Sequence, residues 1–323
     1  MMTNRPQLTR IVFTYDPDEA LLDAVTTHVP GADVVVADDD TVAEQIAGAQ
    51  LVIGGTIPDN ALARADALVW QHVTWAGVES ILTPGLKERG IVLTNSRGVS
   101  APNMAEHVLA MMLALGRAIP YYVKKQEQRV WRGWYERPPT YELTGQTVVL
   151  LGTGAIGKAT ATRLRAFGCR VIGARRRPSP LDEFHEIIGF DDLPRVLPEA
   201  DHVVSSLPMT PHTEKLLSAE LIDAMKPGAY FFNVGRGGTV DQDALISALE
   251  DGRLGGAGLD VTDPEPLPED SPLWSLPNVL ITAHTSGASP QVGPRVVELM
   301  IENLRRYEAG EDLLNVVDYD QGY

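Results

Sequence analysis

The chain has 323 residues, 44% of them hydrophobic and 22% charged, which is typical of a globular protein with room for two domains. Its 43 acidic residues outnumber the 27 basic ones and give a formal net charge of −16, which disfavours binding to nucleic acid or to an anionic membrane surface. One cysteine, Cys169, excludes a disulfide framework. Without a hydrophobic leader or an apolar run that could cross a bilayer, the sequence predicts a cytoplasmic protein.

The first hundred residues alternate short apolar runs with amphipathic stretches. Nearly continuous apolar strands separated by helices are typical of a parallel sheet that is covered on both faces. The sequence predicts strands at 11–14, 33–37, 51–54, 68–73 and 91–95. It predicts helices at 18–27, 41–47 and 60–65.

The pattern changes at Ser100, where Pro102 in the first turn indicates the start of a long apolar helix. A segment rich in Trp, Tyr and Arg follows at 121–141 and contains Trp131 and Trp134. An exposed aromatic segment is typical of a subunit interface, so we expect a homodimer. The alternative is that the segment packs against its own domain.

Strand–helix alternation resumes at about residue 146 and continues to the last helix. The predicted strands are 147–151, 170–174, 202–207, 229–234, 256–261 and 279–282. The predicted helices are 155–167, 219–225, 242–250 and 292–309. This second run again favours a parallel sheet.

A glycine-rich turn joins the strand at 147–151 to the helix that follows it. Gly152, Gly154 and Gly157 form a G-x-G-x-x-G pattern. The first glycine permits the tight turn, the second lets a pyrophosphate approach the backbone, and the third lets the helix pack closely on the strand. Because the free N–H groups of a helix N-terminus favour phosphate, the sequence predicts a dinucleotide-binding loop.

The same residues partly match the P-loop of ATPases, because Gly152 to Lys158 also spell G-x4-G-K. A P-loop needs Ser or Thr at the next position to hold Mg²⁺, and Ala159 has no hydroxyl. The additional Gly154 further favours the dinucleotide interpretation. We therefore predict no metal site.

Three adjacent arginines, Arg175, Arg176 and Arg177, follow the strand at 170–174. At about this distance from the glycines, an NAD site places an acidic residue that binds the ribose 2′-hydroxyl. A guanidinium instead binds a 2′-phosphate through charge-assisted hydrogen bonds. The arginines therefore favour NADP(H), with NAD(H) still accepted; the alternative is a solvated basic loop.

Polar residues stand at the carboxyl ends of three later strands, where ligands bind in open α/β sheets. They are Arg236, then Asp260 with Glu265, and finally His284. With these motifs in this order, the chain resembles the D-isomer-specific 2-hydroxyacid dehydrogenases over essentially its whole length. The resemblance is strongest to the glyoxylate/hydroxypyruvate and 2-ketoacid reductase branch.

The resemblance implies an α/β fold with two doubly wound parallel-sheet domains and a cleft between them. A flavodoxin-like substrate domain would comprise residues 1–99 plus 291–323. A Rossmann domain that binds NAD(P) would comprise residues 100–290. The implied activity is hydride transfer between NADP(H) and a small 2-oxo acid, which gives a D-2-hydroxy acid.

The same resemblance implies roles for the polar residues. Arg236 would bind the substrate carboxylate and polarise its 2-oxo group, and His284 would protonate the carbonyl oxygen as hydride arrives. Glu265 would orient the imidazole and favour its protonated form. Asp260 would anchor the nicotinamide carboxamide.

Further contacts are implied in two places. In a loop at 73–78, the backbone amides of Ala76 and Gly77 would hold the substrate carboxylate, with Trp75 as a pocket wall. The remaining residues expected to contact the cofactor are Ala155, Ile156, Leu207, Pro208, Thr213, Val234, Gly235 and Gly287.

Two interpretations remain open at this point. The first is a metabolic reductase that acts on a small 2-oxo acid. The second is a non-enzymatic, nucleotide-sensing binding protein of the same fold, similar to the transcriptional corepressors that resemble this family. The short tails favour the enzyme. Of the other histidines, we interpret His72, His107 and His202 as structural.

Overall fold

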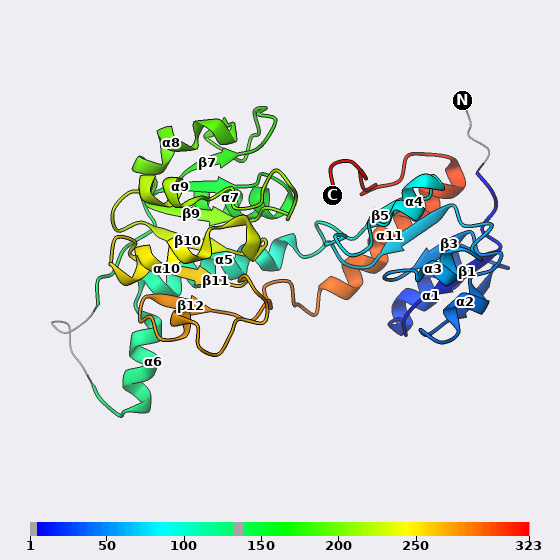
Figure 1. Cartoon of the computed structure of the whole chain (residues 1–323), viewed down its shortest axis with the longest axis horizontal. Coiled ribbons are helices and arrows are strands. Elements are labelled where there is room, and N and C mark those ends of the chain that lie inside the picture. The colour runs from blue at the N-terminus through cyan, green and yellow to red at the C-terminus, as the bar shows by residue number, and fades with distance from the viewer. Residues whose placement is uncertain (1–4, 132–137, 323) are drawn as a thin grey trace. The chain divides into compact units, whose positions relative to one another are not determined.

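The computed structural model describes residues 5–131 and 138–322. The chain forms two compact units, each built around its own sheet (Figure 1). The first unit comprises Met1–Val99 and Ser289–Tyr323, and the second comprises Ser100–Ala288. The sequence-based boundaries lay after residues 99 and 290.

The first unit contains a five-stranded parallel sheet in the order β2-β1-β3-β4-β5. Its strands are β1 (Arg10–Phe13), β2 (Asp33–Val36), β3 (Leu51–Ile53), β4 (Trp70–Val73) and β5 (Val92–Asn95). Its helices are α1 (Glu19–His28), α2 (Val42–Gln45), α3 (Asp59–Leu62), α4 (Pro84–Glu88) and α11 (Val292–Ala309).

Both faces of this sheet are covered, because successive side chains of a strand point to opposite sides. Ile11 and Phe13 of β1 pack against α1 and α11, whereas Val12 packs against the short helices on the other face. The ring of Trp70 stacks on Tyr307 of α11, with ring centroids 5.4 Å apart. The C-terminal helix therefore completes the core of the N-terminal sheet.

The second unit contains a seven-stranded parallel sheet in the order β12-β11-β10-β9-β6-β7-β8. Its strands are β6 (Thr147–Leu151), β7 (Arg170–Ala174), β8 (Glu186–Ile188), β9 (His202–Ser205), β10 (Tyr230–Asn233), β11 (Gly256–Leu259) and β12 (Val279–Ile281). The strand order reverses between β6 and β9, which makes their carboxyl ends the switch point where doubly wound folds bind ligands.

Helices cover both faces of this second sheet as well. They are α5 (Ala101–Gly116), α7 (Ala155–Ala166), α8 (Leu193–Val196), α9 (Ala219–Ala224) and α10 (Gln242–Glu250). A further helix, α6 (Ile119–Glu127), follows α5. Short 3₁₀ turns lie at Phe190–Asp192, Leu197–Glu199, Gly237–Thr239 and Pro272–Trp274. The predicted α/β class with two doubly wound parallel sheets is confirmed.

The aromatic segment predicted at 121–141 divides into parts with different surroundings. Helix α6 extends away from the sheet of its unit and buries none of its residues (Figure 1). Trp131 is fully exposed, and Trp134 lies outside the described residues. Tyr141, in contrast, packs on its own unit, and its hydroxyl donates to the Met112 carbonyl at 2.7 Å.

The longest described helix, α11, is amphipathic and contains several charged residues. Within residues 5–131 and 138–322, no helix is both long and hydrophobic enough to cross a bilayer.

Candidate active site

The glycine-rich turn at the end of β6 has the geometry that a closely approaching phosphate requires. Gly152 has a φ of +99°, a conformation that favours glycine. A Cβ at Gly157 would collide with the carbonyl oxygen of Gly152, so the third glycine brings α7 against the strand. A Cβ at Gly154 would meet nothing within 4 Å, which leaves open space where a ligand would lie.

The first turn of α7 presents backbone donors to that open space. The first helical hydrogen bond runs from the amide of Lys158 to the carbonyl of Gly154 at 2.9 Å. Among the described residues, the amides of Ala155, Ile156 and Gly157 have no acceptor. Three free N–H groups at the positive end of a helix dipole suit a pyrophosphate, so the residues fit a dinucleotide.

The loops after β9 and β10 pack closely beside this turn. A Cβ at Gly152 would approach the hydroxyl of Ser206 to 2.9 Å, and a Cβ at Gly235 would approach the amide nitrogen of Leu207 to 2.7 Å. The hydroxyl of Thr213 donates to the carbonyl of Pro208 at 2.7 Å and fixes the loop after β9. The side chains of Leu207 and Val234 are buried, so only their backbone is available to a ligand.

The three arginines lie directly after β7. Arg175 is half-buried, and its Nη1 donates to the hydroxyl of Ser179 at 3.3 Å. Arg176 is half-buried as well, and Arg177 is exposed. The partner of the Arg175 guanidinium is thus a neutral hydroxyl. This contact does not compensate the positive charge of the guanidinium.

His284 and Glu265 form a direct pair at the carboxyl edge of the sheet. His284 Nδ1 lies 2.8 Å from Glu265 Oε2, and the other carboxylate oxygen accepts from the amide of Thr262 at 3.1 Å. A carboxylate is only an acceptor, so Nδ1 carries the hydrogen. In the part of the chain that the structure describes, Nε2 of His284 has no partner, and the ring is half-exposed. The arrangement orients one ring nitrogen and presents the other.

Arg236 follows β10 and belongs to the same edge of the sheet. Its backbone carbonyl accepts from Asn233 Nδ2 at 3.1 Å and from Thr239 Oγ1 at 2.7 Å. Its Nη1 donates to the carbonyl of Gly235 at 2.9 Å. A Cβ at Gly237 would collide with the carbonyl of Thr262, so the loop that carries Arg236 contacts the segment that carries Glu265.

Asp260, at the end of β11, has a carboxylate that is fully buried beneath the loop that carries His284. Oδ1 accepts from the hydroxyl of Thr282 at 2.6 Å and from the amide of Thr285 at 2.9 Å. The amide of Ser286 donates to both oxygens, at 3.2 and 3.1 Å. Burial disfavours the ionised carboxylate, but hydrogen bonds from Ser286, Thr282 and Thr285 outweigh burial and hold the pKa of Asp260 below its usual value.

Gly287 follows this loop, and a Cβ there would meet nothing closer than the hydroxyl of Ser100, at 4.0 Å. The sequence did not single out Thr262 or Thr282, although both bond directly to predicted site residues. Neither belongs to a recognisable motif. Their position at the end of a strand is the only signal that could have identified them.

The loop at 73–78 lies at the carboxyl edge of the first unit's sheet. Hydrogen bonds from β5 and from the residue after it hold two carbonyl groups of this loop. Asn95 Nδ2 donates to the carbonyl of Ala76 at 2.6 Å, and the amide of Ser96 donates to the carbonyl of Trp75 at 3.0 Å. Within the described ranges, the amides of Ala76 and Gly77 have no acceptor. Trp75 is half-exposed and lies against Gly55, where a Cβ would come within 3.2 Å of the indole. These free amides suit a carboxylate.

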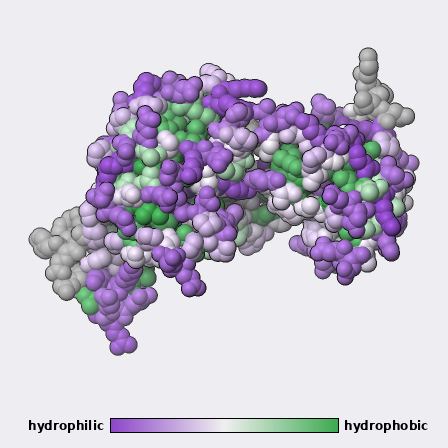
Figure 2. All heavy atoms as spheres, viewed as in Figure 1, coloured by the Kyte–Doolittle hydropathy of each residue, from purple (hydrophilic) through white to green (hydrophobic). Residues whose placement is uncertain are grey.

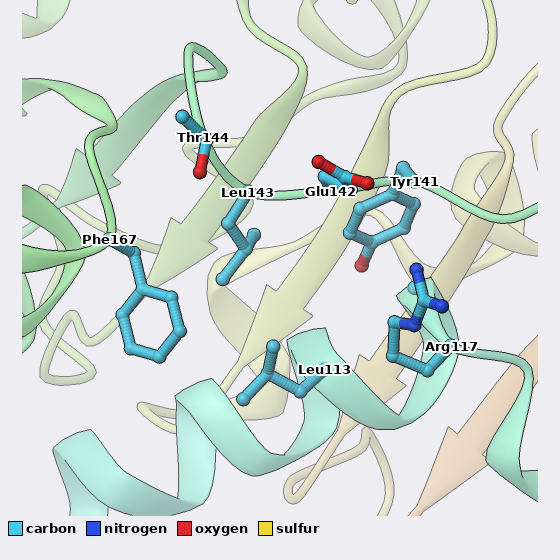
Figure 3. Close-up of a pocket in the computed structure, with 8 residues that line it drawn as sticks. Leu113, Arg117, Tyr141, Glu142, Leu143, Thr144 and Phe167 are labelled. Atoms are coloured by element: carbon cyan, nitrogen blue, oxygen red, sulfur yellow. The ribbon is translucent and has the colours of Figure 1, made fainter.

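A surface hollow of about 220 Å³ lies elsewhere on the second unit and contains none of these residues. Figure 3 shows Leu113 and Arg117 on α5 below the segment that carries Tyr141 and Glu142, with Phe167 to one side. Within the described ranges, no cluster of three or more His, Cys, Asp or Glu could hold a metal ion.

Comparison with known proteins identifies relatives along most of the chain. The model of the family described as "D-isomer specific 2-hydroxyacid dehydrogenase, NAD binding domain" matches residues 109–286. A glycerate dehydrogenase of Methylorubrum extorquens is 32% identical over 288 residues, which are 86% of this chain and 88% of that one. A glyoxylate/hydroxypyruvate reductase B of Pectobacterium carotovorum is 33% identical over 271 residues, 82% of this chain and 83% of that one.

Solved structures agree with these matches. A D-isomer specific 2-hydroxyacid dehydrogenase from Xanthobacter autotrophicus, in complex with NADPH and MES, superposes with a TM-score of 0.84 at 32% identity. The match covers 98% of this chain and 99% of that one. The family match spans more than half of the chain and includes the glycine-rich turn, Arg236, Glu265 and His284. The chain therefore belongs to the family of D-isomer specific 2-hydroxyacid dehydrogenases.

Proposed function

We propose that this protein is an NADPH-dependent reductase that converts small 2-oxo acids such as glyoxylate or hydroxypyruvate into the corresponding hydroxy acids. The observation that carries the proposal is the pair of His284 and Glu265, with Nδ1 bonded to the carboxylate and Nε2 free among the described residues. This arrangement suits a proton donor to a carbonyl oxygen. The names of the relatives support the same substrate class.

The protein's own residues have distinct tasks in this reaction. When bound, NADPH supplies the hydride that reduces the 2-oxo carbon. Because Nδ1 of His284 donates to Glu265, Nε2 is the atom that holds the proton and delivers it to the carbonyl oxygen. Glu265, by accepting from Nδ1, orients the ring for that transfer.

Two groups are proposed to bind the substrate. The guanidinium of Arg236 offers paired donors to a carboxylate and its neighbouring 2-oxo oxygen. The free amides of Ala76 and Gly77 offer further donors to a carboxylate. Trp75, beside Gly55, is proposed as a wall that limits the size of the substrate.

The cofactor contacts are proposed from the same structure. The amides of Ala155, Ile156 and Gly157 would bind the pyrophosphate, and the loops after β9 and β10 would border it. Arg175, with its uncompensated charge beside Ser179, would bind the 2′-phosphate together with Arg176 and Arg177. The nicotinamide contact of Asp260 and the contact of Gly287 remain predictions.

The assembly and location are also proposed. Apolar side chains are exposed on α6, where Figure 2 shows hydrophobic atoms among hydrophilic ones, and a second copy of the chain would cover them in a homodimer. The single cysteine, Cys169, is buried, and burial raises the pKa of its thiol to about 11. An inert free thiol fits a reducing cytoplasm.

The test is a substrate panel run with both reduced cofactors. We expect NADPH oxidation with glyoxylate or hydroxypyruvate, slower turnover with 2-oxo acids that have bulky side chains, and a higher kcat/KM with NADPH than with NADH. A purified protein that binds NADPH but turns over no 2-oxo acid would contradict the proposed function and favour a nucleotide-sensing role.

A further inference from the structure

We propose that His107, Thr282 and Asp260 form a partly buried positioning network that fixes the loop at 282–286 and thereby aims the imidazole of His284. The inference rests on the proposed role of His284 as the proton donor. It assigns a function to His107, which the sequence identifies only as structural, and to Thr282, which no motif marks.

Several hydrogen bonds converge on the carboxylate of Asp260. Its carboxylate is closed off from solvent and accepts from three successive parts of the loop, namely Thr282 Oγ1, the amide of Thr285 and the amide of Ser286. The two bonds at 2.6 and 2.9 Å are as short as charge-assisted bonds are. Asp260 therefore ties both flanks of His284 to the end of β11.

The hydroxyl of Thr282 has a defined direction in its two hydrogen bonds. Thr282 has a single hydroxyl hydrogen, and its 2.6 Å contact with an acceptor-only carboxylate uses that hydrogen. Thr282 Oγ1 also lies 2.9 Å from Nε2 of His107, so at this contact the hydroxyl accepts and His107 Nε2 donates. His107, on α5, thus holds the hydroxyl in the orientation that serves Asp260.

The network also includes the backbone of His284 itself. The amide of His284 donates to the carbonyls of Asp260 at 2.8 Å and Thr282 at 2.9 Å. His284 has a φ of +52°, in the left-handed region that a residue with a Cβ rarely adopts. Such a conformation persists only where its surroundings over-determine it, and the network around Asp260 supplies those constraints.

Helix α5 supplies a second support for the same loop. Asn103 Nδ2 donates to the carbonyl of Ser286 at 2.8 Å, one turn of the helix before His107. The loop that carries His284 is therefore bonded to β11 on one side and to α5 on the other. A proton donor aimed in this way needs little rearrangement before it transfers its proton.

The decisive experiment is a double-mutant cycle between Thr282 and His284. Thr282→Val keeps the shape and removes the hydroxyl, and we expect it to lower kcat by about tenfold to a hundredfold, because a buried charged acceptor loses its donor. Thr282→Ser restores the hydroxyl and should recover most of that rate. In the His284→Ala background, Thr282→Val should change the remaining rate by less than about twofold, because the group that it positions is absent.

A second pair of variants tests the network from α5. His107→Gln keeps an N–H donor at a similar reach and should retain most of the rate, whereas His107→Leu should lower kcat. The dissociation constant of NADPH, measured by fluorescence, should stay within about twofold of wild type in Thr282→Val and His107→Leu. This pair keeps the inference testable if Thr282→Val does not fold.

A readout that does not depend on turnover is the tautomer of His284, measured by ¹⁵N chemical shifts in histidine-labelled protein. The signal is assigned by its loss in His284→Ala. In wild type and Thr282→Ser we expect the neutral ring to carry its hydrogen on Nδ1, whereas in Thr282→Val and His107→Leu part of it should shift to Nε2.

The outcomes separate the two proposals. If wild type reduces no 2-oxo acid, the proposed function fails, and the tautomer measurement still decides the positioning role. If wild type is active but the Val and Leu variants match it, or if Thr282→Val slows both backgrounds equally, the positioning network is overturned while the proposed function stands.

Discussion

The hydrogen bond between His284 and Glu265 orients the proposed proton donor, so its loss should slow reduction. Glu265→Gln keeps the side-chain shape, but its amide has one acceptor oxygen in place of two, and that oxygen must serve either His284 Nδ1 or the amide of Thr262. We expect kcat to fall by about tenfold to a hundredfold, measured as NADPH oxidation with glyoxylate at saturating concentrations.

His284→Ala is the matched control for this loss. It removes the proton donor and should cost on the order of 10²–10⁴ in rate, more than Glu265→Gln does. If Glu265→Gln turns over as fast as wild type while chemistry limits the rate, Glu265 does not orient His284.

Arg175 sets a second expectation at the scale of one residue. Its guanidinium contacts the hydroxyl of Ser179 and is free to bind a 2′-phosphate, so Arg175→Asp should weaken binding of 2′,5′-ADP by about tenfold to a hundredfold and leave 5′-AMP almost unchanged. Calorimetry measures both ligands. Arg195→Asp is the control for net charge, because Arg195 is paired with Glu186. Equal losses for the two ligands would contradict a 2′-phosphate contact.

The sequence predicted the residues that carry chemistry better than the residues that position them. Arg236, Glu265 and His284 stand at strand ends, and a parallel sheet places such ends along one edge whatever the details of packing. The bond between His107 and Thr282 joins residues 175 positions apart on a helix and a strand end. Only the packing of α5 against the sheet brings these two side chains together, so no local pattern could have identified their contact.

At the scale of elements, prediction succeeded where burial is strongly periodic. The bounds of β6, β7, α10 and α11 agree with the sequence analysis, because each has a continuous apolar run or a clear amphipathic pattern. The short elements α4, α8 and β8 were not predicted. With three to five residues each, they bury too few side chains to produce a period.

Strand β9 begins with a buried histidine that gives the second unit a pH-dependent stability. Both ring nitrogens of His202 lack a partner among the described residues, and burial lowers its pKa to about 4. Because the folded state holds the neutral ring, stability is complete above the ordinary pKa of about 6.5 and is lost as pH falls toward 4. Between pH 7 and pH 5 we expect a loss of about 1–2 kcal/mol in the free energy of unfolding from this residue.

The test is urea unfolding of wild type and His202→Phe at the two pH values. The ring of His202 lies among Tyr141, Tyr230 and Phe232, with centroids 4.8–6.0 Å away, so an aromatic replacement suits the site. The variant should flatten the pH dependence. His212→Phe, at an exposed position, should leave it as in wild type. An unchanged slope in His202→Phe would show that His202 binds protons equally in the folded and unfolded states.

At the scale of the whole molecule, the exposed apolar surface predicts association. Ile119 and Val123 of α6 are 50% and 47% exposed, and Trp131, beyond the helix, is almost entirely exposed. Leu113 and Phe167, which line the hollow in Figure 3, add further exposed apolar surface on the same unit. The chain has a net charge of −16 and therefore enough polar residues to cover this surface. Because the surface is nevertheless apolar, it favours an interface.

We therefore expect light scattering at micromolar concentration to give about 70 kDa, twice the mass of the 35.0 kDa chain. Val123→Asp places a charge in the centre of the proposed interface and should shift the mass toward that of one chain, because an unpaired buried charge opposes association. Gln126→Asp adds the same charge at an exposed position of the same helix and serves as the control. A monomeric wild type, or a Val123→Asp variant that associates as tightly as Gln126→Asp, would show that α6 is not the contact between two copies.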